Sequence, residues 1–333
     1  MTTPHYAKTI LTAVIASLSL GAGAVHAQDN INLKLAYAQN SQPVKDALAL
    51  FGELVEEKSN GSISVSYFPD SQLGGESELV ELLQAGAIDM TKVSGGLMGS
   101  FSSIYDVFSM PYLFEDQEHF YQVMNDEEIM RDVYHSTEGQ GFVGVGWYDS
   151  GQRNFYTTGD PIESVADLAG KKIRVMQSQT AIDTMKLLGA SPVVMAQEEV
   201  YTALQQGVLD GAENNEFALT TARHGEVVDH YTLDGHTRIP DIILISNRVL
   251  ESLSDEQRDA VMEAIQESTE FQTEQWLEAV ANARTQIREE FGVEINEVDI
   301  APFQEAVQPM YKELENTPEQ YAIYQQIKAV NTQ

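Results

Sequence analysis

The segment G-K-K-I-R-V-M at residues 170–176 contains the first candidate for anion binding. Its apolar and basic residues alternate as in a strand, so Ile173 and Val175 face one side while Lys172 and Arg174 face the other. A guanidinium binds a carboxylate through two parallel hydrogen bonds, which a lysine ammonium cannot do. A surface arginine paired with a nearby carboxylate is the more common arrangement, so the case for Arg174 depends on its neighbours.

Further polar side chains follow the ends of expected strands. In an open parallel sheet, the loops at the carboxyl ends of the strands line the ligand crevice. Arg153 follows the turn after a strand at residues 142–148, and Asn214 follows a strand at residues 208–212. The other members of this set are Gln39, Asn40, Glu76 and Ser94. For each residue taken singly, a helix cap or a solvated loop position is an equally good interpretation.

The elements that must position these residues follow a strand-helix-strand rhythm. A strand at residues 31–37, a helix at 44–55 and a strand at 63–68 form one unit, which implies parallel pairing and a right-handed crossover. The rhythm begins again after residue 170, with helices at 181–188 and 198–205 and extended segments at 192–195 and 208–212. The sequence therefore predicts an α/β protein of two similar lobes, with helices flanking mixed sheets.

A long C-terminal helix is expected to brace both lobes. Ser254 and Gln257 form a capping box, and helical periodicity continues from there to about Phe291. At ~1.5 Å per residue, such a helix reaches more than ~50 Å, which exceeds one lobe. We expect a first lobe of residues 28–149 and 240–275, a second of residues 150–239 and 276–333, and a ligand cleft between them.

Residues 1–27 have the pattern of a secretory signal peptide. Lys8 gives a weak positive start, residues 10–20 are apolar, and small residues precede the expected cleavage site after Ala27. No later segment approaches the roughly 18 apolar residues of a transmembrane helix. The mature chain is expected to begin near Gln28 and to be exported.

The composition excludes several classes of function. The chain has 19 Lys and Arg against 51 Asp and Glu, a net charge of -32, which argues against nucleic-acid binding. It contains no cysteine, which excludes disulfides, thiolate catalysis and cysteine metal sites. The acidic, lysine-poor surface suggests a salty habitat, and no cofactor is expected.

An ordered set of short motifs resembles one family over nearly the whole mature chain. It comprises F-P-D-S-Q-L-G-G-E, L-L-Q-A-G-A-I-D-M, P-Y-L-F, G-Q-R-N-F-Y-T, D-L-A-G-K-K-I-R-V-M, L-G-A-S-P-V-V-M, E-E-V-Y-T-A-L-Q-Q-G-V-L-D-G-A-E-N-N and G-H-T-R-I-P. The set is similar to the DctP-type solute-binding subunits of tripartite ATP-independent periplasmic (TRAP) transporters. The resemblance implies a monomeric periplasmic protein of a Gram-negative bacterium. Such a protein closes its two lobes on a small organic acid and delivers it to a sodium-driven permease.

The resemblance also implies residue roles. The arginine of the K-I-R-V motif clamps the ligand carboxylate in that family, which gives Arg174 this role. Arg153 and Asn214 match further ligand contacts, and Glu213 and His236 match positions that would hold Arg153 in place. For His236, a core histidine with one hydrogen bond is a close alternative.

The motifs look most like the branch that binds hexuronates such as glucuronate and galacturonate. Sialic acid is doubtful, because this chain differs from the sialic-acid type near Gln197 and Ser94. A sugar acid calls for hydrogen-bonding side chains around its hydroxyls. The residues that fit this demand are Gln39, Asn40, Glu76, Asp149, Gln197 and Asn215. Ectoine, aromatic acids, aldonates and C4-dicarboxylates remain possible ligands of the same fold.

Two other classes of function compete with transport. A secreted enzyme acting on acidic sugars is possible in so acidic a chain, but no nucleophile elbow, zincin helix or phosphate loop occurs in the sequence. A surface adhesion or structural protein is disfavoured because repeats and low-complexity tracts are missing. We therefore expect a binding protein and not an enzyme.

Overall fold

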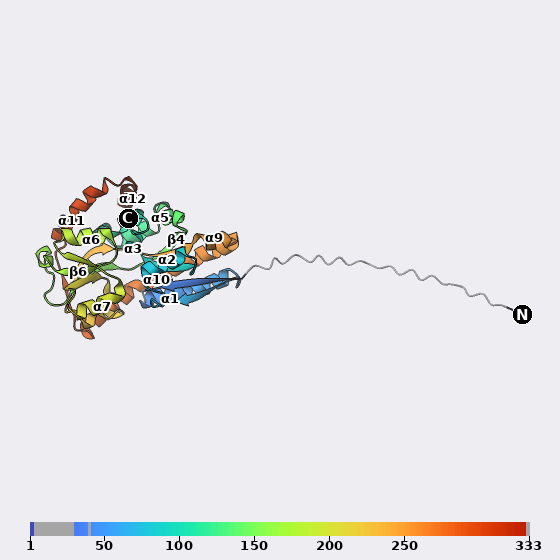
Figure 1. Cartoon of the computed structure of the whole chain (residues 1–333), viewed down its shortest axis with the longest axis horizontal. Helices are drawn as coiled ribbons and strands as arrows, with labels where there is room; N and C mark the ends of the chain where they lie inside the picture. Colours follow the sequence, from blue (N-terminus) through green and yellow to red (C-terminus); the bar gives the residue numbers. More distant parts are fainter. Residues whose placement is uncertain (3–29, 39–40, 331–333) are drawn as a thin grey trace.

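The computed structural model describes residues 1–2, 30–38 and 41–330 (Figure 1). The predicted signal peptide beyond its first two residues lies outside the described residues, as do Gln39 and Asn40. None of the helices in the described part of the chain combines the length and apolar character needed to cross a bilayer.

The first lobe is built on a five-stranded sheet with the strand order β2-β1-β3-β10-β4. β1, β2 and β3 are parallel, whereas β10 runs antiparallel to both of its neighbours, β3 and β4. Every residue of β4 and β10 is buried, as in strands covered on both faces. The strands are β1 (Ile31–Tyr37), β2 (Ile63–Phe68), β3 (Met90–Ser94), β4 (Phe142–Tyr148) and β10 (Asp241–Ser246).

The second lobe is built on a six-stranded sheet with the strand order β11-β9-β5-β8-β6-β7. β6 is parallel to β7 and β8, while β5 is antiparallel to β8 and β9. The strands are β5 (Gln152–Thr157), β6 (Lys172–Val175), β7 (Ser191–Val194), β8 (Gly211–Asn214), β9 (His230–Arg238) and β11 (Glu294–Glu297). The prediction of an α/β fold with two lobes and mixed sheets is confirmed.

Helices flank both sheets and connect them. In Figure 1, β6 and α7 lie toward one end of the body, and α1 and α9 toward the other. The α-helices are α1 (Gln42–Lys58), α2 (Glu76–Gln84), α3 (Gly95–Met98), α4 (Gln117–Met124), α5 (Glu127–His135), α6 (Gln179–Leu187), α7 (Gln197–Gln205), α8 (Glu216–Thr220), α9 (Asn247–Ser252), α10 (Asp255–Glu289), α11 (Ala301–Leu314) and α12 (Pro318–Ala329). The 3-10 helices are η1 (Ser103–Ser109), η2 (Glu138–Gln140), η3 (Val165–Leu168) and η4 (His224–Glu226).

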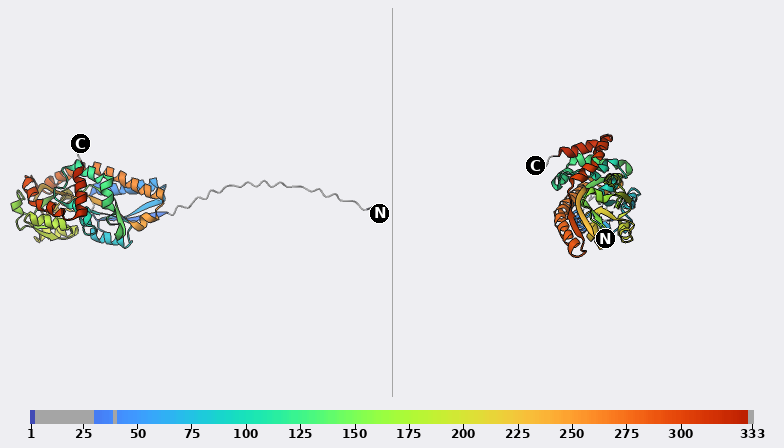
Figure 2. Two further views of the ribbon diagram at one scale, coloured as in Figure 1. Left: turned by 90° about the horizontal axis from the view of Figure 1, so that it is seen from above. Right: turned by 90° about the vertical axis from the view of Figure 1, so that its left-hand side faces the viewer.

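Helix α10 is the predicted brace between the lobes. It has 35 residues and begins with the predicted capping box, in which Gln257 N–H donates to Ser254 Oγ at 3.2 Å. Near its start Val261 packs into the core beneath the first sheet, and near its end Ile287 packs into the core of the second. At ~1.5 Å per residue the helix is about 50 Å long, and its orange ribbon runs along the body in Figure 2.

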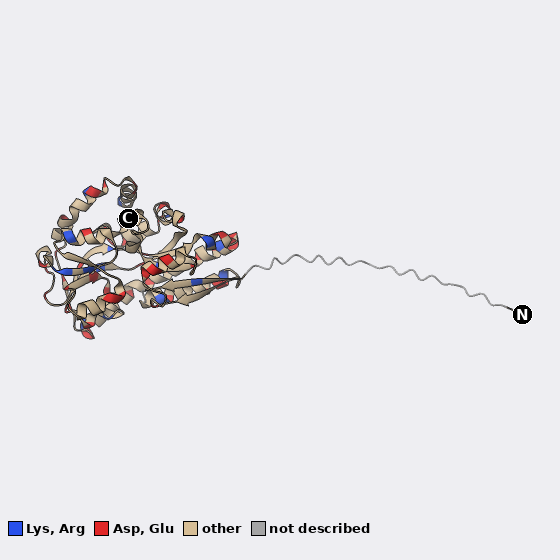
Figure 3. Ribbon diagram, viewed as in Figure 1, with Lys and Arg blue, Asp and Glu red and all other residues tan. Residues whose placement is uncertain are grey.

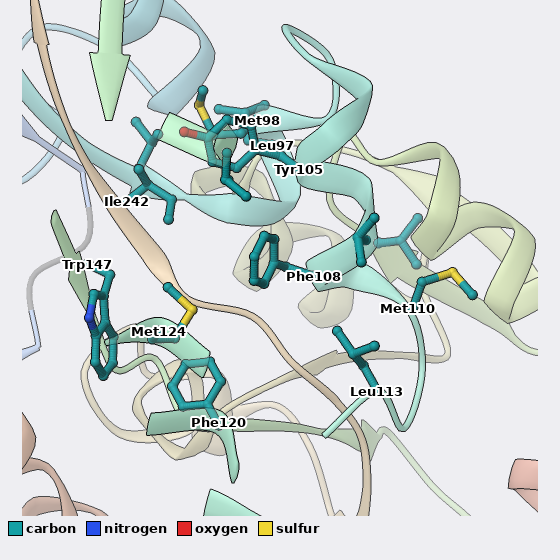
Figure 4. Packing of buried hydrophobic residues seen from close by; sticks show 14 of the residues in the cluster. Leu97, Met98, Tyr105, Phe108, Met110, Leu113, Phe120, Met124, Trp147 and Ile242 are labelled. Atoms are coloured by element: carbon teal, nitrogen blue, oxygen red, sulfur yellow. The ribbon is translucent and has the colours of Figure 1, made fainter. Parts of the chain in front are cut away.

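One apolar core extends across both lobes. It includes Val93 and Ile242 from the first sheet and Ile173 and Val175 from the second. Phe108 of η1 lies in this core, and Figure 4 shows it among Tyr105, Met110 and Leu113. The C-terminal helices close the same core, since α11 contacts α6 while α12 contacts η1 and α5. The exact lobe boundaries therefore stay a prediction.

Candidate functional site

A cavity of about 390 Å³ lies between the two lobes. This volume is near the small end of the roughly 300–1,000 Å³ range of ligand pockets, which suits a small molecule. The cavity is lined at strand ends and helix starts, as expected for an α/β crevice. The sequence-predicted residues among its lining are Glu76, Ser94, Arg153, Arg174, Gln197, Asn214 and Asn215.

Arg174 lies on β6 and is only 4% exposed, although it lines the cavity. Its Nε and Nη2 donate to Met195 O at 3.0 and 2.8 Å, and its Nη1 donates to Gln197 Oε1 at 3.0 Å. All three hydrogen bonds go to neutral acceptors, and no carboxylate of the described residues is within ion-pair distance. Burial lowers the pKa of Arg174 below its usual value. Since a buried charge without a counter-ion is costly, this guanidinium favours an anion in the cavity.

Arg153 lines the same cavity but already has a carboxylate partner. Its Nη2 donates to Glu213 Oε1 at 3.0 Å, and its Nη1 donates to Asn214 Oδ1 at 2.9 Å. The antiparallel pairing of β5 with β8 sets this geometry, because it places Asn154 opposite Asn214 and Phe155 opposite Glu213. The charge of Arg153 is therefore balanced within the protein.

Behind Arg153, Glu213 is the first of three buried titratable residues in a row, followed by His236 and Asp234. His236 places Nε2 3.4 Å from Glu213 Oε2 and Nδ1 2.8 Å from Asp234 Oδ2, and the Phe155 ring stacks on it at 4.6 Å. Burial lowers the pKa of His236, but the two carboxylates outweigh burial and raise this pKa to about 9. Burial likewise raises the pKa of Glu213, but Arg153 and His236 outweigh it and hold this pKa at about 2. Arg153, Glu213, His236 and Asp234 together are thus close to neutral.

The opposite wall of the cavity, on the first lobe, is acidic. Glu76 begins α2, and its Oε1 accepts a hydrogen bond from Ser94 N at 3.1 Å. The buried Lys92 ammonium lies 2.8 Å from Asp241 Oδ2 and 4.0 Å from Glu76 Oε1. Burial raises the pKa of Glu76 to about 7, with Asp241 adding to the rise and Lys92 opposing it.

The remaining predicted residues have more varied positions. Gln197 Oε1 accepts from both Arg174 and Asn214, so it links the two strands that carry them. Asn215 caps α8 by accepting from Phe217 N at 3.0 Å, and its amide donates to Ser150 O at 2.7 Å. Both polar atoms of Asn215 are therefore engaged by the protein itself.

Asp149 is not among the described residues that line the cavity, which corrects its predicted position there. It is fully buried, and its Oδ2 accepts from Arg238 Nη2 at 2.6 Å and from Tyr121 Oη at 2.7 Å. Both acceptor contacts are supplied by the protein, so the sequence position after β4 was right but the direction of the side chain was not.

Sequence reasoning missed several cavity residues. Asp241 and Glu198 line the cavity, and buried Lys92 stands behind Glu76. A lysine in the middle of the strand pattern that gives β3 was a usable signal for Lys92, because a buried ammonium requires an acidic partner. Glu198 had no such signal, since its hydrogen bond from Ser71 Oγ at 2.8 Å joins residues 127 positions apart.

The chain is similar to known proteins over most of its length. The sequence model of the family "Bacterial extracellular solute-binding protein, family 7" (DctP) matches residues 36–317. Protein YiiZ of Salmonella typhimurium is 60% identical over 296 residues, 89% of this chain and 90% of the relative.

Two solved structures of TRAP periplasmic solute-binding proteins are also similar. The first, from Anaerococcus prevotii with bound α/β-D-glucuronate, has a TM-score of 0.87 and 39% identity, covering 90% of this chain and 97% of that one. The second, from Xanthobacter autotrophicus with bound β-D-galacturonate, has a TM-score of 0.85 and 35% identity, covering 90% and 100%.

Proposed function

The chain belongs to the DctP family, family 7 of the bacterial extracellular solute-binding proteins, and we propose that its ligand is a hexuronate, D-glucuronate or D-galacturonate. As a TRAP periplasmic solute-binding protein it belongs with binding proteins rather than enzymes. Its proposed task is to capture the sugar acid and deliver it to the permease subunits of the transporter.

The observation that carries the proposal is that one of the two cavity arginines has a carboxylate partner in the described part of the protein and the other does not. Arg153 is balanced by Glu213, whereas the hydrogen bonds of Arg174 reach only Met195 O and Gln197. A ligand carboxylate would supply the counter-ion that Arg174 lacks. Charge-assisted hydrogen bonds contribute about 1.5–3 kcal/mol each, so a two-point contact would dominate the affinity.

The rest of the cavity suits the hydroxyl groups of a sugar acid. Gln197 and Asn214 offer amide groups beside the arginines, and Glu76 offers acceptors on the facing wall. Ligands in the two similar structures described above are hexuronates, which supports the same class here. The proposed contacts are Arg174, Arg153, Asn214, Gln197, Glu76 and Ser94; Gln39 and Asn40 stay predictions because they lie outside the described residues.

We further propose that the lobes close on the ligand. Two hydrogen bonds already join the lobes at the cavity edge, from Ser71 Oγ to Glu198 Oε1 at 2.8 Å and from Ser77 Oγ to Gln177 Oε1 at 2.6 Å. The proposed lobes are residues 28–149 with 240–275 and residues 150–239 with 276–333. Export across the inner membrane by the predicted signal at residues 1–27 completes the proposal.

Calorimetry on the mature chain tests the ligand and the role of Arg174 together. We expect binding of D-glucuronate or D-galacturonate in preference to C4-dicarboxylates, ectoine and aromatic acids. Arg174→Ala should weaken binding at least about 100-fold, in line with two lost charge-assisted hydrogen bonds, and Arg174→Lys should also bind poorly because it loses the fork.

The matched control is Arg131→Ala. The Arg131 side chain is 66% exposed, and its ion pair with Asp132, at 3.9 Å, is a surface contact. It should bind like the wild type. Equal affinity in Arg174→Ala and Arg131→Ala would overturn the assignment of Arg174, and binding of a dicarboxylate alone would overturn the hexuronate proposal.

A further inference from the structure

The first-lobe wall of the cavity carries two carboxylates that share one ammonium. Glu76 and Asp241 both line the cavity. Lys92 lies 2.8 Å from Asp241 Oδ2 but 4.0 Å from Glu76 Oε1, so Asp241 is its nearer partner. With both acids ionised, Glu76, Asp241 and Lys92 together keep a net negative charge. Because Lys92 lies closer to Asp241, the charge of Glu76 is the less well neutralised of the two.

The neighbours of Glu76 on its own wall do not cancel that charge, and the cation that faces it is Arg174 of the second lobe, whose pKa Glu76 raises while burial lowers it. Glu198, which reaches the cavity from α7 of the second lobe, raises the pKa of Glu76 further, after burial and Asp241. Asp70 and Glu78 also line this side, and Lys45 is paired with Asp70 at 3.2 Å. Ser94 N, at 3.1 Å, is a neutral donor. The Glu76 side chain is still 25% exposed, so its free acceptor positions reach the cavity.

An ionised carboxylate accepts hydrogen bonds and cannot donate them. Glu76 therefore suits a ligand hydroxyl, which donates, and repels a second ligand carboxylate, which can only accept and has the same charge. Above the Glu76 pKa of about 7, the two lobes thus give the cavity a polarity, with the cationic Arg174 on the second lobe and the anionic Glu76 on the first.

We propose that Glu76 determines specificity by excluding sugar diacids, so that the site takes acids with one carboxylate and hydroxyls at the other end. This inference rests on the proposed function and assigns the basis of selection within that site. The contact discriminates by repelling the wrong ligand. The excluded class is the aldarates, in which both ends of the six-carbon chain are carboxylates.

The test is a gain of binding in Glu76→Gln, measured by calorimetry at pH 8. Glutamine has the same shape and keeps an oxygen to accept from Ser94 N, but it has no charge and can donate. The wild type should bind D-galacturonate and should bind D-galactarate at least about 100-fold more weakly. Glu76→Gln should bind D-galactarate at least about 10-fold better than the wild type does.

Two controls isolate the second carboxylate. D-galactonate has the same open chain with one carboxylate, so its affinity should change much less than that of D-galactarate in Glu76→Gln. Glu81→Gln changes an exposed acid of the same helix that does not line the cavity, and it should behave as the wild type.

Lowering the pH offers a second measurement. Protonation of Glu76 between pH 8 and pH 6 should improve the binding of D-galactarate to the wild type, while Glu76→Gln should stay nearly flat. If Glu76→Gln binds D-galactarate no better than the wild type, or gains D-galactonate equally, the inference is wrong. If the wild type binds neither hexuronate, the proposed function itself fails, which is a separate result.

Discussion

The two cavity arginines differ in what surrounds them. Arg153 is the visible end of a buried chain of charges that continues through Glu213 and His236 to Asp234. Removing one member of such a chain leaves a buried charge without a partner, which typically costs 3–5 kcal/mol. Arg174 has no such chain behind it. Substitutions in the first group should therefore reduce stability, whereas substitutions of Arg174 should mainly reduce binding.

His236→Gln should destabilise the protein in a pH-dependent way. The pKa of His236 is raised to about 9, above its usual 6.5, by Asp234 and Glu213 against the effect of burial. The imidazolium thus stabilises the fold fully below about pH 6.5, and this contribution is lost as the pH rises through about 9. The loss in unfolding free energy should be on the order of 3 kcal/mol at pH 6 and should shrink toward pH 10.

Thermal unfolding at pH 6, 8 and 10 checks this expectation. His135→Gln is the control, because His135 is an exposed side chain, 3.5 Å from Glu138. An equal loss of stability for His236→Gln at pH 6 and pH 10 would contradict the charged state assigned to His236.

At the scale of elements, Asp149 joins three of the described segments that run between the two sheets. It lies between β4 and β5, and its Oδ2 accepts from Arg238, which ends β9 just before β10. Its backbone N–H donates to Gln272 Oε1 of α10 and its C=O accepts from Gln272 Nε2, both at 2.9 Å. The Arg238 guanidinium also lies 4.8 Å from the centre of the Phe120 ring. Asp149 thus holds together the β4–β5 connection, the end of β9 and α10, three of the described segments that run between the two sheets.

Asp149→Asn should therefore reduce stability by about 3 kcal/mol, because it leaves the buried Arg238 guanidinium without its counter-ion. Urea unfolding measures the change, and Asp183→Asn, at an exposed acid paired with Lys186, is the control. The Arg238→Met variant and the double variant complete a thermodynamic cycle. Additive losses in that cycle would show that Asp149 and Arg238 do not act as a pair.

Local sequence patterns predicted the helices and strands well, but they did not predict which distant side chains pair with one another. The capping box at Ser254 and the helical periodicity after it predicted α10. The alternation in K-I-R-V predicted β6, with Arg174 on the face opposite Ile173 and Val175. Both features depend on residues close together in sequence. The pair Lys92–Asp241 and the pair Asp149–Arg238 join residues 149 and 89 positions apart, so no local pattern contains them.

The position of Asp149 illustrates this limit. Its place at a strand end was correct, but side chains at a strand end can turn either into the crevice or into the core. Arg238 and Tyr121 decide the direction, and both come from distant segments. By contrast, Arg153 and Asn214 reach the cavity because β5 and β8 are adjacent, which the strand order supplies.

At the scale of the whole molecule, negative charge is the dominant feature. The chain has a net charge of -32, and Figure 3 shows the basic residues only as short, separate stretches of the ribbon. Such an excess of one sign opposes compaction by self-repulsion. The same field slows the approach of an anionic ligand at low ionic strength, although Arg174 attracts the ligand once it is inside the cavity.

Raising NaCl from 0.05 M to 1 M should therefore increase the melting temperature and speed hexuronate association. The Debye length falls to about 3 Å at 1 M, which screens the repulsion between exposed acids. Calorimetric melts and stopped-flow binding measure the two effects, with sucrose of equal osmolarity as the control. A lower melting temperature in high salt would contradict this account, and the salty habitat inferred from composition stays a prediction.

The place of β10 in the first sheet determines when that sheet can be completed. β10 (Asp241–Ser246) lies between β3 and β4, although the chain passes through strands β5 to β9 of the second lobe before reaching it. A chain leaving the ribosome therefore carries an unfinished first sheet, with β3 and β4 unpaired on facing edges, until residue 246 has been made. Long-range pairing of this kind folds slowly. For a protein with a predicted export signal, late closure keeps the newly made chain unfolded for longer, while translocation is still possible.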